Sequence, residues 1–369
     1  MIMITALTNG ILFTGTERIE NKALLFDEEG IREIVGNNKI PTDATIIDCK
    51  GVYVAPGLID LQIYGAGGYL FSAKPSAEAL QAITDAIVQS GTTSFLLTLA
   101  TNSVPIYRDA IHTVRYNPHP ALLGLHLEGP YINQEKKGAH LEEFIKVPTT
   151  EEVEAMCDEA QGILKMVTLA PEVTDPSVIR LLVNNGVIVS AGHSNATYEE
   201  GLKGFEAGIQ TVTHFFNAMS SLHHRATGLP GATAVANVYA SIIADGIHVD
   251  YSTVVLSKKM LGEKLFLITD AVEESSEGPY LHVKTEDRFT LPDGTLSGSK
   301  LTLLQAVKNC VQHCSIPLDE ALRMASTYPA NLLGTQDLGR FEAGAKANIL
   351  LFDEDFNVLG VYLEGKNQQ

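Results

Sequence analysis

The sequence predicts an α/β protein: a (β/α)8 TIM-like barrel with a small β-sandwich domain formed by the N- and C-terminal segments. Two observations predict it. Eight short apolar runs alternate with amphipathic stretches of helical length, the pattern of a parallel sheet buried on both faces. Both ends of the chain instead carry short alternating segments separated by Gly, Asn and Pro. We therefore expect a catalytic barrel over residues 54–337 and a sandwich domain from residues 1–53 and 338–369.

The expected barrel strands are short and rich in Leu or β-branched residues. In chain order these runs are 54–63, 93–99, 121–127, 165–170, 187–191, 211–216, 239–244 and 264–269. The helical patterns between them cover 77–90, 150–160, 176–185, 198–207 and 251–261, with a weaker one over 106–116. Acidic residues follow Thr150, which predicts a helix start there, and Gly186 and Gly208 fall where helices should end. The count of eight favours a closed barrel over an open sheet.

The terminal segments and one internal segment differ from this pattern. The terminal strands are expected at 23–26, 31–35, 45–48, 347–352 and 358–363, with a turn over 353–357. Residues 274–298 follow the eighth run and are rich in Gly, Pro and charge. We expect them to form an insertion over the barrel mouth, with a hairpin built on Pro292-Asp293-Gly294.

Composition narrows the classes of partner. The 369 residues include 26 Lys and Arg against 44 Asp and Glu, so the net charge of −18 argues against nucleic acid or an anionic membrane as partner. A small anionic substrate is not excluded. Residues 1–16 lack the basic region and cleavage site of a secretory signal, and no apolar run reaches the length of a membrane helix. Four scattered cysteines fit a reducing compartment, so we expect a cytoplasmic protein.

Polar residues close five of the expected strands. In strand order they are Glu128, His193, His214, His248 and Asp270. Catalytic residues of a barrel lie at the carboxyl ends of its strands, so these side chains should meet at one face. Any of them alone could be structural, but the set is what metal-assisted hydrolysis requires.

The residue types suggest how the roles divide. Glu128, His193 and His214 supply one oxygen and two nitrogen ligands for a single divalent ion, with a position left for water. Zinc is expected, with Fe, Mn and Co left open. Asp270 could move a proton, and His248 could hydrogen-bond the oxygen on which charge develops. The other histidines considered are expected at the surface: His112, His119, His282 and His313.

Several strings containing these residues resemble the amidohydrolase superfamily and, within it, the N-acetylglucosamine-6-phosphate deacetylases. They occur in the order of that family over nearly the whole chain. The strings are Ala55-Pro56-Gly57-Leu58-Ile59-Asp60, His126-Leu127-Glu128-Gly129-Pro130, Lys137-Gly138-Ala139-His140, Gly192-His193-Ser194-Asn195-Ala196, Thr213-His214 with Asn217-Ala218-Met219, Ala244-Asp245-Gly246-Ile247-His248-Val249-Asp250, Thr269-Asp270-Ala271, Leu296-Ser297-Gly298-Ser299 and Ser326-Thr327-Tyr328-Pro329-Ala330.

The resemblance implies the same metal ligands, Asp270 as general acid and base, and His248 on the substrate carbonyl. It also implies substrate contacts. His140 resembles a residue lining the sugar pocket, and Asn217 and Ala218 resemble a pair that contacts the phosphate. Arg225 resembles an arginine that reaches the substrate of the neighbouring subunit, so a homodimer is implied. A guanidinium is well suited to phosphate because it can bind two of its oxygens at once.

The first strand departs from the superfamily. Much of the superfamily has two histidines at its end, which hold a second metal, whereas this chain has Gln62 and Tyr64. Neutral Gln and Tyr are poor ligands for transition metals, so we expect one ion per chain. Gln62 is counted among the substrate-binding residues, with a water in the vacant second position as its expected partner.

The reaction implied is hydrolysis of N-acetylglucosamine 6-phosphate to glucosamine 6-phosphate and acetate, a step of amino-sugar metabolism. Three alternatives remain. The substrate could be another N-acetyl hexosamine 6-phosphate, such as the galactosamine epimer, or a cyclic amide. The implied phosphate contacts disfavour unphosphorylated rings. The barrel could also be a non-catalytic binding protein, although such a protein has no need of the Asp270 carboxylate.

Overall fold

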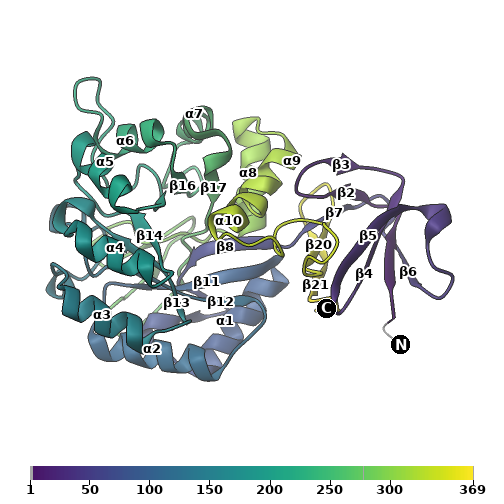
Figure 1. Cartoon of the computed structure of the whole chain (residues 1–369), viewed down its shortest axis with the longest axis horizontal. Coiled ribbons are helices and arrows are strands. Elements are labelled where there is room, and N and C mark those ends of the chain that lie inside the picture. The colour runs from purple at the N-terminus through teal and green to yellow at the C-terminus, as the bar shows by residue number, and fades with distance from the viewer. Residues whose placement is uncertain (1–2, 277, 369) are drawn as a thin grey trace. The chain divides into compact units, whose positions relative to one another are not determined.

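The computed structural model describes residues 3–276 and 278–368, and its central element is the predicted barrel (Figure 1). Eight strands form one sheet in the order β17-β16-β15-β14-β13-β12-β11-β8, so neighbours in the chain are neighbours in space. Their bounds are β8 (Leu58–Ile63), β11 (Thr92–Ala100), β12 (Leu122–Glu128), β13 (Leu164–Leu169), β14 (Ile188–Ala191), β15 (Thr211–Val212), β16 (Tyr239–Ile242) and β17 (Leu265–Leu267). A parallel bridge between Ile63 and Ala271 joins the first strand to the segment after the last one.

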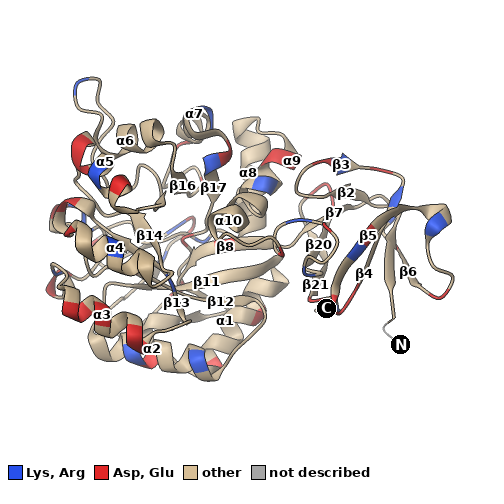
Figure 2. Cartoon of the chain, in the orientation of Figure 1, with Lys and Arg blue, Asp and Glu red and all other residues tan. Residues whose placement is uncertain are grey.

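Helices separate the barrel strands as predicted. They are α1 (Ala77–Gln89), α2 (Val104–Tyr116), α3 (Thr150–Glu159), α4 (Pro176–Asn184), α5 (Tyr198–Ala207), α6 (Gly228–Ala236), α7 (Tyr251–Leu261), α8 (Leu303–Cys314), α9 (Leu318–Met324) and α10 (Thr327–Leu332). The N-cap of α3 is Thr149 rather than Thr150, because the Thr149 hydroxyl accepts the Glu152 N–H. Acidic residues are prominent on α3 and α5 (Figure 2). The helices α6 and α8 to α10 were not predicted.

The predicted strand 54–63 is in fact two strands in two different sheets. β7 (Tyr53–Pro56) pairs with β2 (Ile11–Phe13) and β20 (Ile349–Phe352), whereas β8 belongs to the barrel. Gly57 lies between them, and a Cβ there would come within 2.0 Å of the Thr93 hydroxyl. The prediction of one strand over 54–63 was therefore wrong, because an uninterrupted apolar run gives no sign of where the chain passes from one sheet to another.

The terminal segments form the predicted β-sandwich. A four-stranded sheet has the order β5-β4-β1-β6, and a six-stranded sheet has the order β22-β21-β20-β7-β2-β3. The remaining bounds are β1 (Thr5–Thr8), β3 (Arg18–Ile19), β4 (Lys22–Asp27), β5 (Gly30–Gly36), β6 (Thr45–Asp48), β21 (Val358–Leu363) and β22 (Lys366–Asn367). Leu24 and Phe26 from one sheet and Val54 and Ile349 from the other share one apolar core.

The chain divides into two compact units. One contains residues 1–60, 86–94 and 302–369, and the other contains residues 61–85 and 95–301. The first unit groups α8 to α10 with the terminal strands, so its limits differ from the predicted domain limits, which remain a prediction. Every residue of the site described below lies in the second unit.

The described part of the predicted insertion, residues 274–276 and 278–298, contains the predicted turn. Leu291 N–H donates to Thr295 O at 2.8 Å around Pro292-Asp293-Gly294. A short hairpin of β18 (Val283–Lys284) and β19 (Phe289–Thr290) precedes it, and a hairpin of β9 (Gly65–Ala66) and β10 (Tyr69–Leu70) follows β8. Over the part of the chain that the structure describes, no helix is both long and apolar enough to span a membrane.

Candidate active site

Three of the predicted metal-binding and catalytic residues have left-handed backbone. They are His193 (φ 47°), His214 (φ 34°) and Asp270 (φ 54°), each just past the end of a barrel strand. This conformation is unfavourable for residues other than Gly and is typical of functional sites. Hydrogen bonds hold it in place: His214 N–H donates to Ser241 Oγ at 2.8 Å, and Asp270 N–H donates to Gln62 O at 2.9 Å. The strand ends thereby turn their polar side chains toward the barrel axis.

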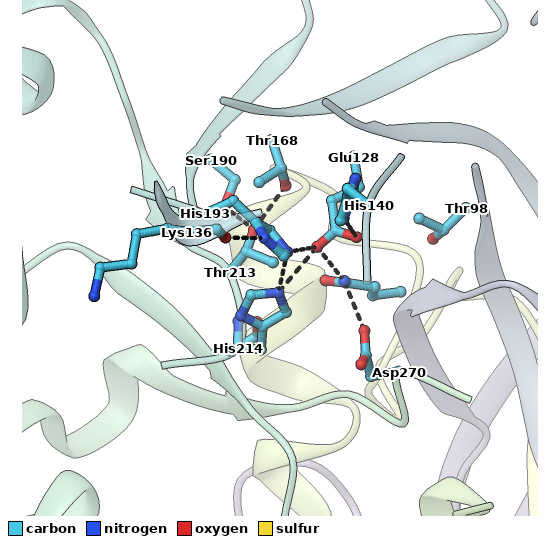
Figure 3. Close-up of polar contacts among 12 residues, drawn as sticks. Thr98, Glu128, Lys136, His140, Thr168, Ser190, His193, Thr213, His214 and Asp270 are labelled. Atoms are coloured by element: carbon cyan, nitrogen blue, oxygen red, sulfur yellow. Dashed lines mark hydrogen bonds and ion pairs between the residues drawn. The ribbon is translucent and has the colours of Figure 1, made fainter. Parts of the chain in front are cut away.

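The three predicted metal ligands converge on one point (Figure 3). Glu128 Oε1 lies 3.0 Å from His214 Nε2 and 3.3 Å from His193 Nε2, and the two Nε2 atoms are 3.1 Å apart. Ligand atoms at 2.0–2.1 Å around a tetrahedral zinc-like ion are separated by about 3.3 Å. All three side chains are buried. Their spacing and chemistry therefore fit a divalent ion.

A hydrogen bond to Nδ1 of His193 leaves its Nε2 available to bind the ion. His193 Nδ1 lies 2.8 Å from Lys136 O, and a carbonyl oxygen can only accept, so the proton is on Nδ1 and Nε2 offers its lone pair. Lys136 ends the 3-10 turn η3 (Gln134–Lys136). Gly138, with φ +54°, follows closely, and a Cβ there would come within 3.3 Å of His193 Cε1. The Lys137-Gly138-Ala139-His140 string thus supports the His193 ring.

His140 also lies beside the carboxylate. Glu128, His140 and His193 offer potential ligand atoms within 4.8 Å of one another. However, Thr101 N–H donates to His140 Nδ1 at 3.2 Å, so the proton of the neutral ring is on Nε2, 3.0 Å from Glu128 Oε2. Burial lowers the pKa of His140 to about 4. His140 is therefore neutral and donates a hydrogen bond to Glu128.

Gln62 and Tyr64 contact the same carboxylate. Gln62 Nε2 donates to Glu128 Oε1 at 2.9 Å and to Asp270 Oδ1 at 2.8 Å, while the Tyr64 hydroxyl donates to Glu128 Oε2. Burial and the Glu128 and Asp270 carboxylates raise the pKa of Tyr64 well above its ordinary value, so the hydroxyl keeps its proton. The amide thus has two protein carboxylates as partners, and Gln62 is not among the residues lining the cavity. Its contact with substrate remains a prediction.

His248 is oriented by Asp245. His248 Nδ1 is 2.6 Å from Asp245 Oδ2, and Asp245 Oδ1 accepts the N–H groups of Ile247 and His248 at 2.8 Å. Burial opposes ionisation of Asp245, but the bond and charge of His248 hold the pKa of Asp245 below its ordinary value. His248 Nε2 is buried without a partner among the described residues, and the side chain lines the cavity. One nitrogen therefore remains available to a ligand.

A cavity of about 350 Å³ connects these groups. It is lined by the polar side chains of Glu128, His140, His193, His214, His248 and Asp270, and by apolar ones that include Leu70, Ala100, Val272 and Tyr280. The predicted phosphate contacts Asn217 and Ala218 also line it, and Asn217 Nδ2 has no hydrogen-bond partner within the described chain. The volume and the mixture of apolar wall and convergent polar groups suit a small polar ligand.

Arg225 lies away from this cavity. It belongs to an exposed run, residues 221–226, and lines a separate hollow with His223 and His224. The predicted contact with the neighbouring subunit's substrate remains a prediction.

Two residues near the site were missed by the sequence analysis. His282 was expected at the surface, but its side chain is buried and lines the cavity. Glu172 accepts hydrogen bonds from Ser194 Oγ at 2.7 Å, Asn195 N–H at 2.5 Å and Asn133 Nδ2 at 2.9 Å, which fixes the loop carrying His193. A signal for Glu172 existed, because it follows β13, a strand to which no site residue had been assigned.

Comparison with known proteins agrees with this geometry. Residues 53–367 match the Amidohydrolase family. The chain belongs to the amidohydrolase family. The N-acetylglucosamine-6-phosphate deacetylase of Haemophilus influenzae is 36% identical over 375 residues, covering 98% of each chain. The N-acetylgalactosamine-6-phosphate deacetylase of Shewanella sp. is 34% identical over 86% of this chain and 83% of its own.

Among solved structures, the N-acetylglucosamine-6-phosphate deacetylase from Pasteurella multocida has a TM-score of 0.94 at 37% identity, with 99% of each chain covered. The resemblance inferred from the sequence strings is therefore confirmed. The amidohydrolase fold is confirmed with it.

Proposed function

We propose that this protein is an N-acetylglucosamine-6-phosphate deacetylase, which hydrolyses the acetamido group to give glucosamine 6-phosphate and acetate. One observation carries the proposal. Glu128 Oε1, His193 Nε2 and His214 Nε2 converge within 3.3 Å of one another in a cavity that also exposes Asp270 and the unpaired Nε2 of His248. These groups together suit metal-assisted hydrolysis of an unactivated amide.

A single divalent ion, proposed to be zinc, would be held by Glu128, His193 and His214. Such an ion supplies a Lewis acid for the carbonyl and lowers the pKa of water at the site. The second oxygen of Glu128, Oε2, already accepts hydrogen bonds from Tyr64 and His140. Because both donors occupy it, this oxygen is not free to hold a second ion, which supports one ion per chain.

Asp270 is placed to move the proton. Its Oδ1 accepts from Gln62 Nε2 at 2.8 Å, and the side chain lines the cavity beside Glu128. The carboxylate takes a proton from the attacking water and returns it to the amine nitrogen as the C–N bond breaks.

His248 is placed to stabilise the carbonyl oxygen. Nδ1 is held by Asp245 at 2.6 Å, so Nε2 donates to that oxygen only when the ring carries both protons. The charge of that doubly protonated ring matches the negative charge developing on the oxygen.

Recognition of the phosphate is proposed for Asn217 and Ala218, joined by Arg225 of a second copy of this chain. The unpartnered Asn217 Nδ2 is a buried donor that a phosphate oxygen would satisfy. The exposure of Arg225 is what supports its contact with a neighbouring subunit in a homodimer. A cytoplasmic location is proposed because the four cysteines are free and buried.

The test is an acetate-release assay combined with metal analysis. The substrates are N-acetylglucosamine 6-phosphate, its galactosamine epimer and unphosphorylated N-acetylglucosamine. We expect one ion per chain and turnover that needs the 6-phosphate. Two ions per chain would contradict the role given to Tyr64 and His140, and absence of acetate from every substrate would overturn the function.

A second candidate is deacetylation of N-acetylgalactosamine 6-phosphate. The observation favouring it is the 34% identity to the Shewanella enzyme named for that substrate. The two sugars differ only at C4, so the ratio of their kcat/KM values decides between the candidates.

A further inference from the structure

We propose that His282 is a specificity-determining residue that binds a ring hydroxyl of the hexosamine. The proposed site lies on the cavity wall across from Asn217 and Ala218. This inference rests on the proposed function and assigns a further contact within that same cavity.

His282 is buried, and its ring nitrogens have no hydrogen-bond partner among the described residues. Only 5% of the residue is exposed, the side chain lines the cavity, and neither Nδ1 nor Nε2 has a partner among residues 3–276 and 278–368. His140, His193 and His248, which line the same cavity, each have a ring nitrogen hydrogen-bonded to the protein. Buried polar atoms without partners are rare because they lose hydration without compensation. A ligand in the cavity would supply what His282 lacks.

The surroundings of His282 indicate the chemical class of that ligand. Burial lowers the pKa of His282 to about 4, so the ring is neutral near pH 7 and offers one donor and one acceptor. A hydroxyl likewise donates and accepts. A phosphate would be better served by a cationic group, which His282 is not at neutral pH. The neutral ring therefore matches a sugar hydroxyl.

The strand order places His282 relative to the other subsites. In the eight-stranded sheet, β11 and β15 are four strands apart, so their ends lie on opposite sides of the barrel. Tyr280 donates to Thr101 O at 2.5 Å just past β11, and its ring lies edge-on to His282 with centroids 6.1 Å apart. Asn217 and Ala218 follow β15.

The substrate can span these positions. With the acetamido group at Glu128 and the phosphate at Asn217, the ring hydroxyls at C1, C3 and C4 are the remaining polar groups of the sugar. Beside His282 is an apolar cluster in which Leu70, Val272 and Tyr280 pack together. In this region of the cavity His282 is presented to the ring together with two small polar side chains, Ser72 and Ser297.

The test compares variants with substrates that lack one hydroxyl. His282→Phe keeps a ring of similar size and removes both polar atoms, whereas His282→Gln keeps one donor and one acceptor. His112→Phe, at an exposed position of α2, is the matched control. kcat and KM for acetate release are measured with N-acetylglucosamine 6-phosphate and with its 1-, 3- and 4-deoxy analogues.

We expect His282→Phe to raise KM about tenfold with kcat changed less than about twofold, and His282→Gln to retain most of the affinity. The wild type should lose about tenfold in kcat/KM with one of the analogues, and His282→Phe should lose nothing further with that analogue. Unchanged KM in His282→Phe, or losses that add for all three hydroxyls, would overturn the proposal.

Further measurements distinguish loss of the hydroxyl contact from misfolding of the variant and from failure of the proposed function. Metal content and Tm of each variant show whether the fold is intact, and if His282→Phe does not fold, His282→Gln is compared with His282→Ala on the same analogues. Loss of the same analogue discrimination in His282→Ala supports the proposal, and its retention overturns it. If the wild type releases no acetate, the proposed function fails. Calorimetric binding of the same sugar phosphates to wild type and variant then decides on His282 alone.

Discussion

The base of the cavity and the wall formed by residues 272–276 and 278–298 face the same space but are built in opposite ways. At the base, Glu128 receives hydrogen bonds from Gln62, Tyr64 and His140, and the left-handed backbone of His214 is held by Ser241. The wall is an apolar cluster containing Val272, Tyr280 and Phe289, and the ring nitrogens of its His282 have no hydrogen-bond partner within the part of the chain that the structure describes. Groups proposed for the chemistry are held in place by the protein, whereas a group proposed for recognition is left for the ligand to satisfy.

The largest effect is expected when one of the proposed metal ligands at the base of the cavity is removed. We expect His214→Ala to lose the bound ion and to lower kcat/KM by at least about a thousandfold, because the remaining two side chains cannot hold it. Metal analysis and acetate release check both effects. Retention of one ion per chain would mean that His140 can replace His214 as a ligand.

The next variant separates proton transfer from metal binding within the base. We expect Asp270→Asn to lower kcat by about 10²–10⁴-fold while the ion is retained, since the amide can still accept from Gln62 but cannot take up a proton. The same two measurements apply. Equal losses of metal and turnover would show that Asp270 is itself needed to hold the ion.

A smaller effect on metal binding is expected for Glu172, which accepts hydrogen bonds from the loop that carries His193. Glu172→Gln weakens the hydrogen bonds to Ser194 and Asn195, so we expect metal affinity to fall by about 10–100-fold with kcat recovered at saturating metal. A competition titration with a chelator measures the affinity. Glu154→Gln, on the exposed side of α3, is the control and should leave the affinity unchanged.

The smallest effect concerns the wall and its dependence on pH. Burial lowers the pKa of His282 to about 4, below the roughly 6.5 of an unfolded histidine, so the unfolded chain binds more protons between these values. The contribution of neutral His282 to the free energy of unfolding is therefore complete above about pH 6.5 and is lost as the pH falls toward 4.

We expect the free energy of unfolding of His282→Gln to fall less between pH 7 and pH 5 than that of wild type, by on the order of 1–2 kcal/mol. Denaturant titrations at both pH values measure it. Parallel losses in the two proteins would show that His282 takes up no proton on unfolding.

The same contrast explains what could be predicted from the sequence. Glu128, His193, His214, His248 and Asp270 were found because a polar residue that closes an apolar run is visible locally. The burial of His282 depends on the Tyr280 hydroxyl reaching Thr101, 179 residues away in the chain, and no local pattern carries that information.

The fold shows the same division between local and distant causes. The helix α6, with the sequence GLPGATAVA, has Thr233 as its one polar side chain, so it lacks the separate polar and apolar faces that mark a surface helix. The run 54–63 is apolar throughout, but its two halves pair with different partners. The chain changes sheet here because β7 and β8 pair with strands far away in the sequence, and the local sequence of residues 54–63 does not reveal those partners.

The contact between β8 and the segment after β17, which closes the barrel, also determines when the active site can be completed during synthesis of the chain. Asp270 N–H donates to Gln62 O, and Gln62 Nε2 donates to Glu128 and to Asp270, which is 208 residues away from Gln62 in the chain. A nascent chain contains all three proposed ligands before residue 270 has been translated. Asp270 can therefore take its place beside these ligands only after the segment that follows β17 has been translated and has paired with β8.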